Sequence, residues 1–235
     1  MGVGIIGSSR LRVSQGGDFP IDGLFSYYKF EETSGDAIDS FSNNNGTILG
    51  NVTQGVEGKI SKGYEFGSGS GISLGSLNLN IENAYSFSLW FKRSGGGIGM
   101  LISNDNSFQA QRFYQLRLNS NGAVEFIRFN SGGGVSTFFG TAESYDDGIF
   151  HLVNSTFSIE NGSRIYVDGV LKAINGDKQP NKSGFGGSHT IGARSSNGTL
   201  NSFIGILDEV AIFENKELNQ EDINKIYNQG NGKTI

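Results

Sequence analysis

Carboxylates and histidines are the residues of this chain that could support hydrolysis of a glycosidic bond. Retaining hydrolysis needs two carboxyl groups about 5–5.5 Å apart, and a strand provides them when acidic residues alternate, as in E-x-D-x-E. The sequence contains no such triplet. Asp208 and Glu209 are adjacent, so in a regular strand their side chains would point to opposite faces. The carboxylate pattern therefore does not predict a glycosidase.

The histidines and glycine runs give no other sign of catalysis. His151 and His189 are the only histidines, and neither belongs to an evident Ser-His-Asp pattern. The glycine runs Gly95–Gly97 and Gly132–Gly134 follow no strand-to-helix pattern, so we interpret them as hairpin loops and not as phosphate-binding loops. We expect a protein that is not an enzyme, with an atypical glycanase as the less favoured alternative.

Polar and aromatic loop residues indicate a second chemistry, the binding of sugars. Aromatic faces pack against sugar rings, while Asn, Asp and Arg side chains supply directional hydrogen bonds. The alternative is that these are the ordinary solvated loops of a β-sandwich. The candidate ligand-binding residues are Asn104, Asp105, Arg112, Tyr145 and Arg194, and further loop residues of the same kind are Asn106, Phe108, Asp146, Asp147, Phe185 and Asn197.

Composition favours one large β-domain. The 235 residues include 37 Gly and 2 Pro, and glycines scattered between short apolar runs predict many tight turns and short strands. Cysteine is absent, which excludes a disulfide framework and a thiolate metal site. A net charge of −5 argues against a nucleic-acid surface. No apolar run reaches the roughly 18 residues of a membrane span, and no secretory signal is evident.

Short apolar runs predict the strands that must carry these loops. The clearest runs from Tyr85 to Lys92, and we expect its Trp90 to pack between a sheet and a loop rather than to bind a sugar. Asp168-Gly169 separates two other runs and is typical of a type I′ hairpin turn. Further strands are expected at 24–30, 63–66, 72–74, 100–103, 114–119, 124–129, 135–140, 149–158, 164–167, 170–173, 189–192 and 203–213.

The C-terminal segment predicts one short helix after the last strand. Asn219 is a favourable N-cap, and Gly230 can end the helix. Ile223, Ile226 and Tyr227 fall at i, i+3 and i+4, so they form one apolar stripe.

These segments together resemble the laminin-G-like, concanavalin-A-like lectin–glucanase jelly-roll family. The family pattern G-x-(I/L)-D-E-V-x-(I/L)-(Y/F) is matched from Gly205 to Phe213, and (L/I)-Y-V-D-G-x-L from Ile165 to Leu171. The resemblance extends from about Leu24 to Asn231. It implies an all-β, two-sheet antiparallel jelly-roll sandwich with one short C-terminal helix over residues 23–235, after an N-terminal arm or linker over residues 1–22.

The resemblance also implies a calcium site. Many members hold one Ca²⁺ ion beside the sandwich, with an Asp from the loop after the first strand and groups near the closing strand. The matching residues are Asp39 and Asp208, and Asn43 could add an amide oxygen, since Ca²⁺ binds hard oxygen ligands. The alternative is that these Asp and Asn side chains only make turns and structural hydrogen bonds.

We therefore expect a non-catalytic, lectin-like carbohydrate-binding module. The arm and the lack of cysteine and of a signal fit a virion surface protein, such as one of a bacteriophage. There the sandwich would engage a host cell-surface glycan, and the arm would bind virion or other protein subunits. The expected location is the virion surface or the extracellular space, with a homo-oligomer as a further expectation and neither nucleic-acid binding nor membrane insertion. The alternative is a structural or decoration protein that acts through protein–protein contacts.

Overall fold

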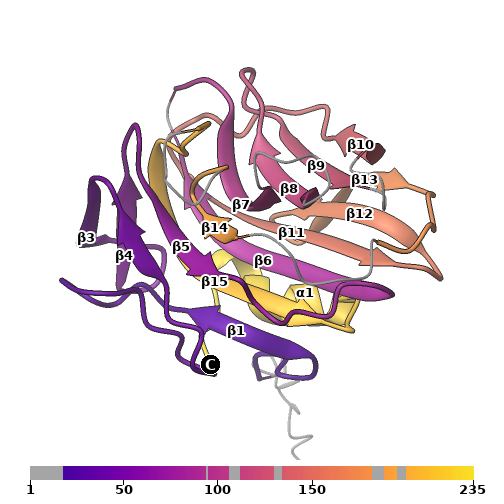
Figure 1. The fold of residues 1–235 in the computed structure, drawn as a ribbon, viewed down its shortest axis with the longest axis horizontal. Helices are drawn as coiled ribbons and strands as arrows, with labels where there is room; N and C mark the ends of the chain where they lie inside the picture. The colour runs from indigo at the N-terminus through magenta and orange to yellow at the C-terminus, as the bar shows by residue number, and fades with distance from the viewer. Residues whose placement is uncertain (1–17, 94, 106–111, 130–133, 182–187, 195–199) are drawn as a thin grey trace, which may run out of the picture.

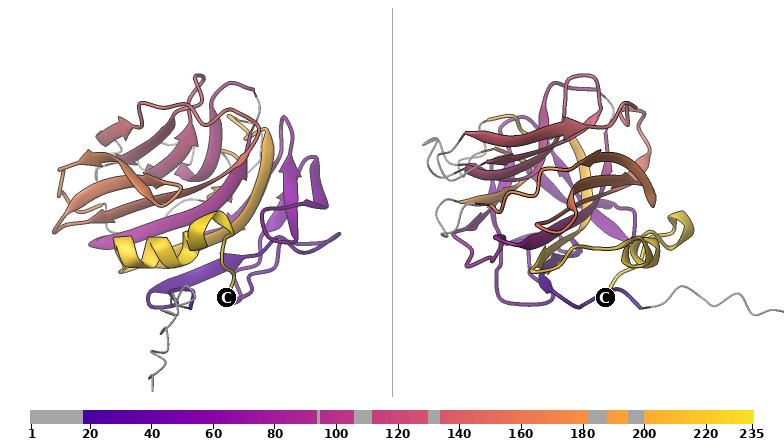
Figure 2. Two further views of the ribbon diagram at one scale, coloured as in Figure 1. Left: turned by 180° about the vertical axis from the view of Figure 1, so that it is seen from behind. Right: turned by 90° about the vertical axis from the view of Figure 1, so that its right-hand side faces the viewer.

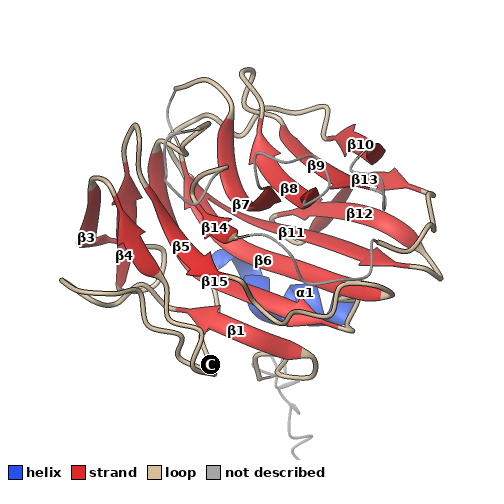
Figure 3. Ribbon diagram, in the orientation of Figure 1, coloured by secondary structure: helices blue, strands red, loops and turns tan. Residues whose placement is uncertain are grey.

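The computed structural model describes residues 18–93, 95–105, 112–129, 134–181, 188–194 and 200–235. Within these residues, fifteen strands form two antiparallel sheets. Figures 1 and 3 show how the two sheets face each other. One α-helix and one 3-10 turn follow the last strand. The predicted all-β jelly-roll sandwich with a short C-terminal helix is confirmed.

The larger sheet has eight strands in the order β13-β12-β11-β6-β15-β4-β3, and β1 pairs with β15. Its strands are β1 (Leu24–Tyr28), β3 (Val52–Glu57), β4 (Lys62–Phe66), β6 (Ala84–Lys92), β11 (Phe150–Ser158), β12 (Gly162–Val167), β13 (Val170–Asn175) and β15 (Gly205–Glu214). The smaller sheet has the order β10-β9-β8-β7-β14-β5-β2. Its strands are β2 (Thr47–Leu49), β5 (Gly71–Gly75), β7 (Gly99–Asp105), β8 (Arg112–Leu118), β9 (Val124–Phe129), β10 (Val135–Gly140) and β14 (His189–Ile191).

The side chains of β6 alternate between the two faces of the larger sheet and contribute to a different apolar cluster on each face. Its inward side chains join the main core between the sheets, as the sequence predicts. Its outward Trp90 joins a second cluster on the other face of the larger sheet. The outward Ser86 fixes the segment before the helix, because its hydroxyl donates to Lys216 O at 2.9 Å and accepts from Leu218 N at 3.0 Å.

Helix α1 (Gln220–Tyr227) covers this outer cluster and is followed by the turn η2 (Asn228–Gly230). In Figure 2 the helix lies across the outer face of the larger sheet. Asn219 caps the helix as predicted, accepting from Asp222 N at 3.0 Å, and the Asp222 carboxylate accepts from Asn219 N. Ile223 and Ile226 are buried and belong to the outer cluster with Trp90, so the apolar side of the helix packs on the sheet.

The packed domain extends further toward the N-terminus than the expected boundary at residue 23. Phe19 is buried, and its ring lies 5.1 Å from the Tyr27 ring and 6.4 Å from the Phe213 ring. Residues 1–17, most of the expected arm, lie outside the described residues. No helix among the described residues combines the length and apolar content needed to cross a membrane.

Candidate functional site

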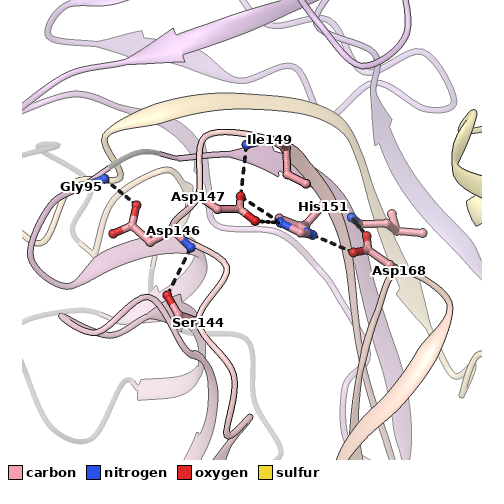
Figure 4. Close-up of polar contacts among 8 residues, drawn as sticks. Gly95, Ser144, Asp146, Asp147, Ile149, His151 and Asp168 are labelled. Carbon is pink, nitrogen blue, oxygen red and sulfur yellow. Dashed lines mark hydrogen bonds and ion pairs between the residues drawn. The ribbon is translucent and has the colours of Figure 1, made fainter.

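The Asp168-Gly169 turn places a carboxylate at the rim of the larger sheet. Both residues have positive φ, 52° and 77°, as a type I′ turn requires. Asp168 Oδ1 accepts from Leu152 N at 2.9 Å, and Asp168 Oδ2 lies 2.6 Å from His151 Nδ1 (Figure 4). The turn between β12 and β13 is therefore tied to the neighbouring strand β11.

His151 is held between two carboxylates. Its second ring nitrogen, Nε2, lies 3.1 Å from Asp147 Oδ1 (Figure 4). The Tyr145 ring packs against the imidazole, with ring centroids 5.1 Å apart. Burial disfavours the charged imidazolium, but the contacts with Asp168 and Asp147 outweigh it and raise the pKa of His151 above 6.5. Both ring nitrogens of His151 therefore have carboxylate partners, which fixes the imidazole and orients the turn.

A cleft of about 470 Å³ lies between this turn and the C-terminal helix. Ligand pockets typically measure about 300–1,000 Å³. The cleft is lined by Asp168, Gly169, Val170, Asn224, Lys225, Tyr227, Asn228 and Gln229. One aromatic ring, three side-chain amides, one ammonium group and one carboxylate thus meet in one cleft.

Packing fixes the aromatic ring of the cleft. The Tyr227 ring stacks on the buried Trp90 ring, with centroids 5.9 Å apart and planes inclined by 20°. Lys59 Nζ lies 4.7 Å from the centroid of Trp90. Gln220 Nε2 donates to Gly169 O at 2.7 Å, which joins the helix to the turn. The expectation that Trp90 is a packing residue is confirmed, and its role is to support Tyr227.

The predicted ligand-binding residues do not form one group in the structure. Asn104, Asp105 and Arg112 lie at one end of the β7–β8 pair, where Asp105 and Arg112 are register partners. Tyr145 and Arg194 lie toward the opposite end, since Tyr145 N bonds Gly122 O in the β8–β9 hairpin and Arg194 N bonds Leu200 O. The side chains of Asp105 and Arg112 lie outside the described part, as do Asn106, Phe108, Phe185 and Asn197.

Two of these residues are buried, which corrects their expected placement on surface loops. Asn104 is 1% exposed, and its Nδ2 lies 2.8 Å from His189 Nε2 in the interior of the sandwich. The reason is that β7 continues to Asp105, past the predicted end at Ser103. Tyr145 is 6% exposed and packs against His151. Both side chains contribute to the packing of the domain.

Asp39, of the predicted calcium ligands, is saturated by hydrogen bonds. Its Oδ1 accepts from Tyr27 N, Phe41 N and Ser42 N, each at 3.0 Å, and its Oδ2 accepts from the Ser42 hydroxyl and from Asn44 N. Asn43, in the same loop, is exposed. As arranged, Asp39 therefore folds its own loop, and its oxygens do not fit an ion without losing these donors.

Asp208 lies elsewhere and shares no hydrogen-bond partner with Asp39. Its Oδ2 accepts from Ile60 N at 2.8 Å, whereas Oδ1 is buried without a partner in the described part of the chain. Among the described residues, no three or more histidine, aspartate or glutamate side chains gather in a way that could hold a metal ion. The calcium site remains a prediction.

A β-bulge overturns the expectation that Asp208 and Glu209 point to opposite faces. The register of β15 against β6 shifts between Asp208 and Ala211, and Glu209 has a φ of 52°. Leu207 and Val210 on either side both point into the main core, so both carboxylates turn to the outer face. Both are buried. Burial raises the pKa of Asp208 to about 7 and that of Glu209 to about 8.

The expectation that the serine-nucleophile pattern G-x-S-x-G is absent is wrong, because Gly71–Gly75 matches it. This pattern supports catalysis when its serine sits on a strand-to-helix turn. Here the five residues form strand β5, and Ser73 pairs with Thr47 and Thr190 on neighbouring strands. Ser73 therefore does not lie on the strand-to-helix turn that a catalytic serine of this pattern requires.

The amides of the cleft were missed as candidate ligand residues. Asn224 lies in α1, and Asn228 follows Tyr227 at the C-terminal end of the helix, so amides close to an aromatic residue in the sequence are a readable signal. The sequence does not reveal that the turn at Asp168 lies beside them. That contact depends on packing between segments more than 50 residues apart.

Residues 66–224 match the family described as the Concanavalin A-like lectin/glucanases superfamily. No curated protein matches the chain. Among solved structures, domain 4 of AbnA, an extracellular arabinanase from Geobacillus stearothermophilus in complex with arabinotriose, is 21% identical with a TM-score of 0.66, covering 89% of this chain and 98% of that one.

Toxin binding domains are similar over about half of their own length. The botulinum neurotoxin serotype D ligand-binding domain in complex with N-acetylneuraminic acid is 19% identical, with a TM-score of 0.65, covering 88% of this chain and 50% of that one. The binding domain of Paraclostridial Mosquitocidal Protein 1 is 16% identical, with a TM-score of 0.69, covering 87% and 52%. At these identities the likeness shows a shared fold.

Proposed function

Since this chain belongs to the Concanavalin A-like lectin/glucanases superfamily, we propose that it is a non-catalytic, lectin-like module that binds a glycan. The proposed site is the cleft between the Asp168 turn and helix α1. The observation that carries the proposal is the Tyr227 ring, which lines an open cleft together with the amides of Asn224, Asn228 and Gln229. Aromatic rings pack on the C–H faces of sugars, and amides both donate to and accept from sugar hydroxyls.

The rigidity of the site supports the proposal. A binding group that is already fixed loses little conformational freedom when a ligand arrives. Tyr227 is stacked on Trp90, and Asp168 is held by His151 and by Leu152 N. The sugar complexes of the arabinanase domain and of the serotype D toxin domain support carbohydrate as the ligand class.

The same contacts support the non-catalytic part of the proposal. Both ring nitrogens of His151 have carboxylate partners, and the carboxylates Asp208 and Glu209 are buried away from the cleft lining. The proposal therefore assigns recognition, and not hydrolysis, to the Asp168 cleft. Incubation with the bound glycan and chromatography of the products checks this, because the proposal expects intact glycan.

The biological setting is a separate part of the proposal. We place the module outside the cell, on a virion surface, with the segment before Phe19 joined to other subunits. The extracellular arabinanase and the toxin binding domains support an extracellular role. Electron microscopy of virus particles from the source of this chain, treated with a labelled antibody against the chain, tests the virion location. Virus particles without bound antibody would contradict it.

Calcium, if this chain binds it, would take Asp208 as ligand rather than Asp39. A thermal shift on adding Ca²⁺ that is reversed by EDTA would establish binding. Asp208→Asn should abolish that shift, and Glu65→Gln, a control at an exposed carboxylate on β4, should leave it unchanged. A shift that survives Asp208→Asn would contradict this assignment.

A glycan array with the wild type and Tyr227→Ala tests the central part of the proposal. Loss of an aromatic contact worth about 1–1.5 kcal/mol weakens binding roughly tenfold. Phe138→Ala is the matched control, because Phe138 is an aromatic residue with 55% exposure that does not line the cleft. Circular dichroism confirms that both variants fold. Equal binding by the wild type and Tyr227→Ala would refute the site, and no glycan binding by the wild type would refute the function.

A further inference from the structure

We infer that the cleft at Asp168 selects uncharged glycans over glycans that carry carboxylate or sulfate groups. This inference rests on the proposed glycan-binding function and concerns its specificity. It follows from how the charged groups around the cleft are paired. The described lining contains one ammonium group, Lys225, and one carboxylate, Asp168.

Lys225 is already engaged with an acidic side chain. Its Nζ lies 2.8 Å from Glu221 Oε1, one helical turn earlier, and the Glu221 side chain is 76% exposed. An anionic sugar that approached Lys225 would therefore meet Glu221 as well. The Glu221 carboxylate therefore lowers the positive potential that Lys225 presents to a second carboxylate or a sulfate.

Asp168 adds negative charge on the other wall of the cleft. Its partner His151 is 8% exposed at the side chain, whereas the Asp168 side chain is 31% exposed. The His151 imidazole is thus buried behind the Asp168 carboxylate, and this carboxylate is the group that solvent and a ligand reach. Its influence reaches the aromatic ring, because burial first and then the charge of Asp168 raise the pKa of the Tyr227 hydroxyl.

The remaining lining groups are neutral and suit sugar hydroxyls. Three side-chain amides and a tyrosine can each donate and accept, and Val170, with 56% exposure, adds an apolar edge. Asn224 Oδ1 also accepts from Gln220 Nε2, and Asn228 Nδ2 also donates to Gly232 O, which leaves the second lone pair of that oxygen and the second N–H of that amide for a sugar. No arginine lines the described cleft, although arginine is the residue that recognises carboxylates through two parallel hydrogen bonds. A neutral oligosaccharide satisfies this set without bringing an anion near Asp168 or Glu221.

The test uses matched pairs of probes on one array. N-acetyllactosamine is compared with its N-acetylneuraminic-acid-capped form, and arabinan oligosaccharides are compared with oligogalacturonates. We expect the neutral member of a pair to bind at least about fivefold more tightly, because like charges at a binding site oppose association. The affinity for the neutral probe should be lower in Tyr227→Ala than in the wild type, and this loss would show that the probe binds in the cleft.

Removal of one counter-ion should change the specificity. Glu221→Gln removes the carboxylate beside Lys225. The ratio of the affinity for the neutral probe to the affinity for the acidic probe should therefore fall by about two- to fivefold. Glu160→Gln is the control, because it removes an equal charge from an exposed residue outside the cleft lining and should change nothing. Tighter binding of the acidic probes in a Tyr227-dependent manner would overturn the inference while the proposed function stands. Binding of neither probe class would overturn both.

Discussion

Replacing Asp208 by asparagine should flatten the pH dependence of stability. Asp208 is fully buried on the β15 bulge, and burial raises its pKa from 3.8 to about 7. In the unfolded chain the carboxyl ionises near its ordinary value, so above pH 4 the unfolded state releases a proton that the folded state still holds. Stability contributed by the protonated form is therefore lost as pH rises from about 4 to about 7.

The size of the effect follows from the two pKa values. One pH unit corresponds to about 1.4 kcal/mol for each proton that differs between the states. From pH 5 to pH 9, Asp208 alone should lower the free energy of unfolding by about 3 kcal/mol. Asparagine keeps an oxygen that can accept from Ile60 N, which Asp208 Oδ2 does at 2.8 Å, but it cannot ionise.

Urea unfolding at pH 5, 7 and 9 in EDTA measures this difference. The comparison uses the fall in unfolding free energy between pH 5 and pH 9, so that a constant effect of the buried amide cancels. We expect a fall that is smaller in Asp208→Asn than in the wild type by about 3 kcal/mol. In Glu209→Gln it should be smaller by about 4 kcal/mol, because burial raises the pKa of Glu209 to about 8. Equal falls in the wild type and Asp208→Asn would show that this carboxyl is ionised in the folded protein and would refute the reasoning.

Two further predictions concern other buried groups. Burial lowers the pKa of His189 to about 4, so the unfolded chain binds a proton at a higher pH than the folded protein does. The free energy of unfolding should therefore fall by about 3 kcal/mol as pH drops from 6.5 to 4. Urea unfolding of His189→Gln should show a fall that is smaller by this amount, and a fall equal to that of the wild type would contradict the prediction. Phe19→Ala should lower the free energy of unfolding by about 3 kcal/mol, because the Phe19 ring is buried against Tyr27. The control Ile21→Ala, at a 60% exposed position, should change this free energy by less than about 0.5 kcal/mol. Equal effects of the two substitutions in thermal unfolding would show that the packing of Phe19 contributes nothing to stability.

Much of the fold could be predicted because local signals agree with the tertiary structure. The alternation from Tyr85 to Lys92 corresponds to β6 (Ala84–Lys92), and the Asp168-Gly169 turn and the Asn219 cap form as expected. In each case the residue type determines the local conformation. Strands β2 and β3 were not predicted, because no residue in either is fully buried and Gly55 interrupts β3 with a φ of 77°.

The candidate site could be predicted only in part. Asp168 and Tyr227 were noted as a turn and a helix-stripe residue, but their meeting depends on the docking of the helix on the sheet. The β15 bulge has no local signal, since Glu209 is not a glycine yet adopts positive φ. The β7 extension that buries Asn104 is likewise set by pairing with β8 and β14.

A glycan titration followed by NMR tests the central claim most directly, because it reports where the ligand binds. Backbone amide shifts of the assigned protein would be recorded as a glycan identified on the array is added. The account predicts that the largest changes fall at 168–170 and 224–229, the residues that line the cleft. Changes centred instead on Asn104, Asp105 and Arg112 at the end of the β7–β8 pair would contradict it.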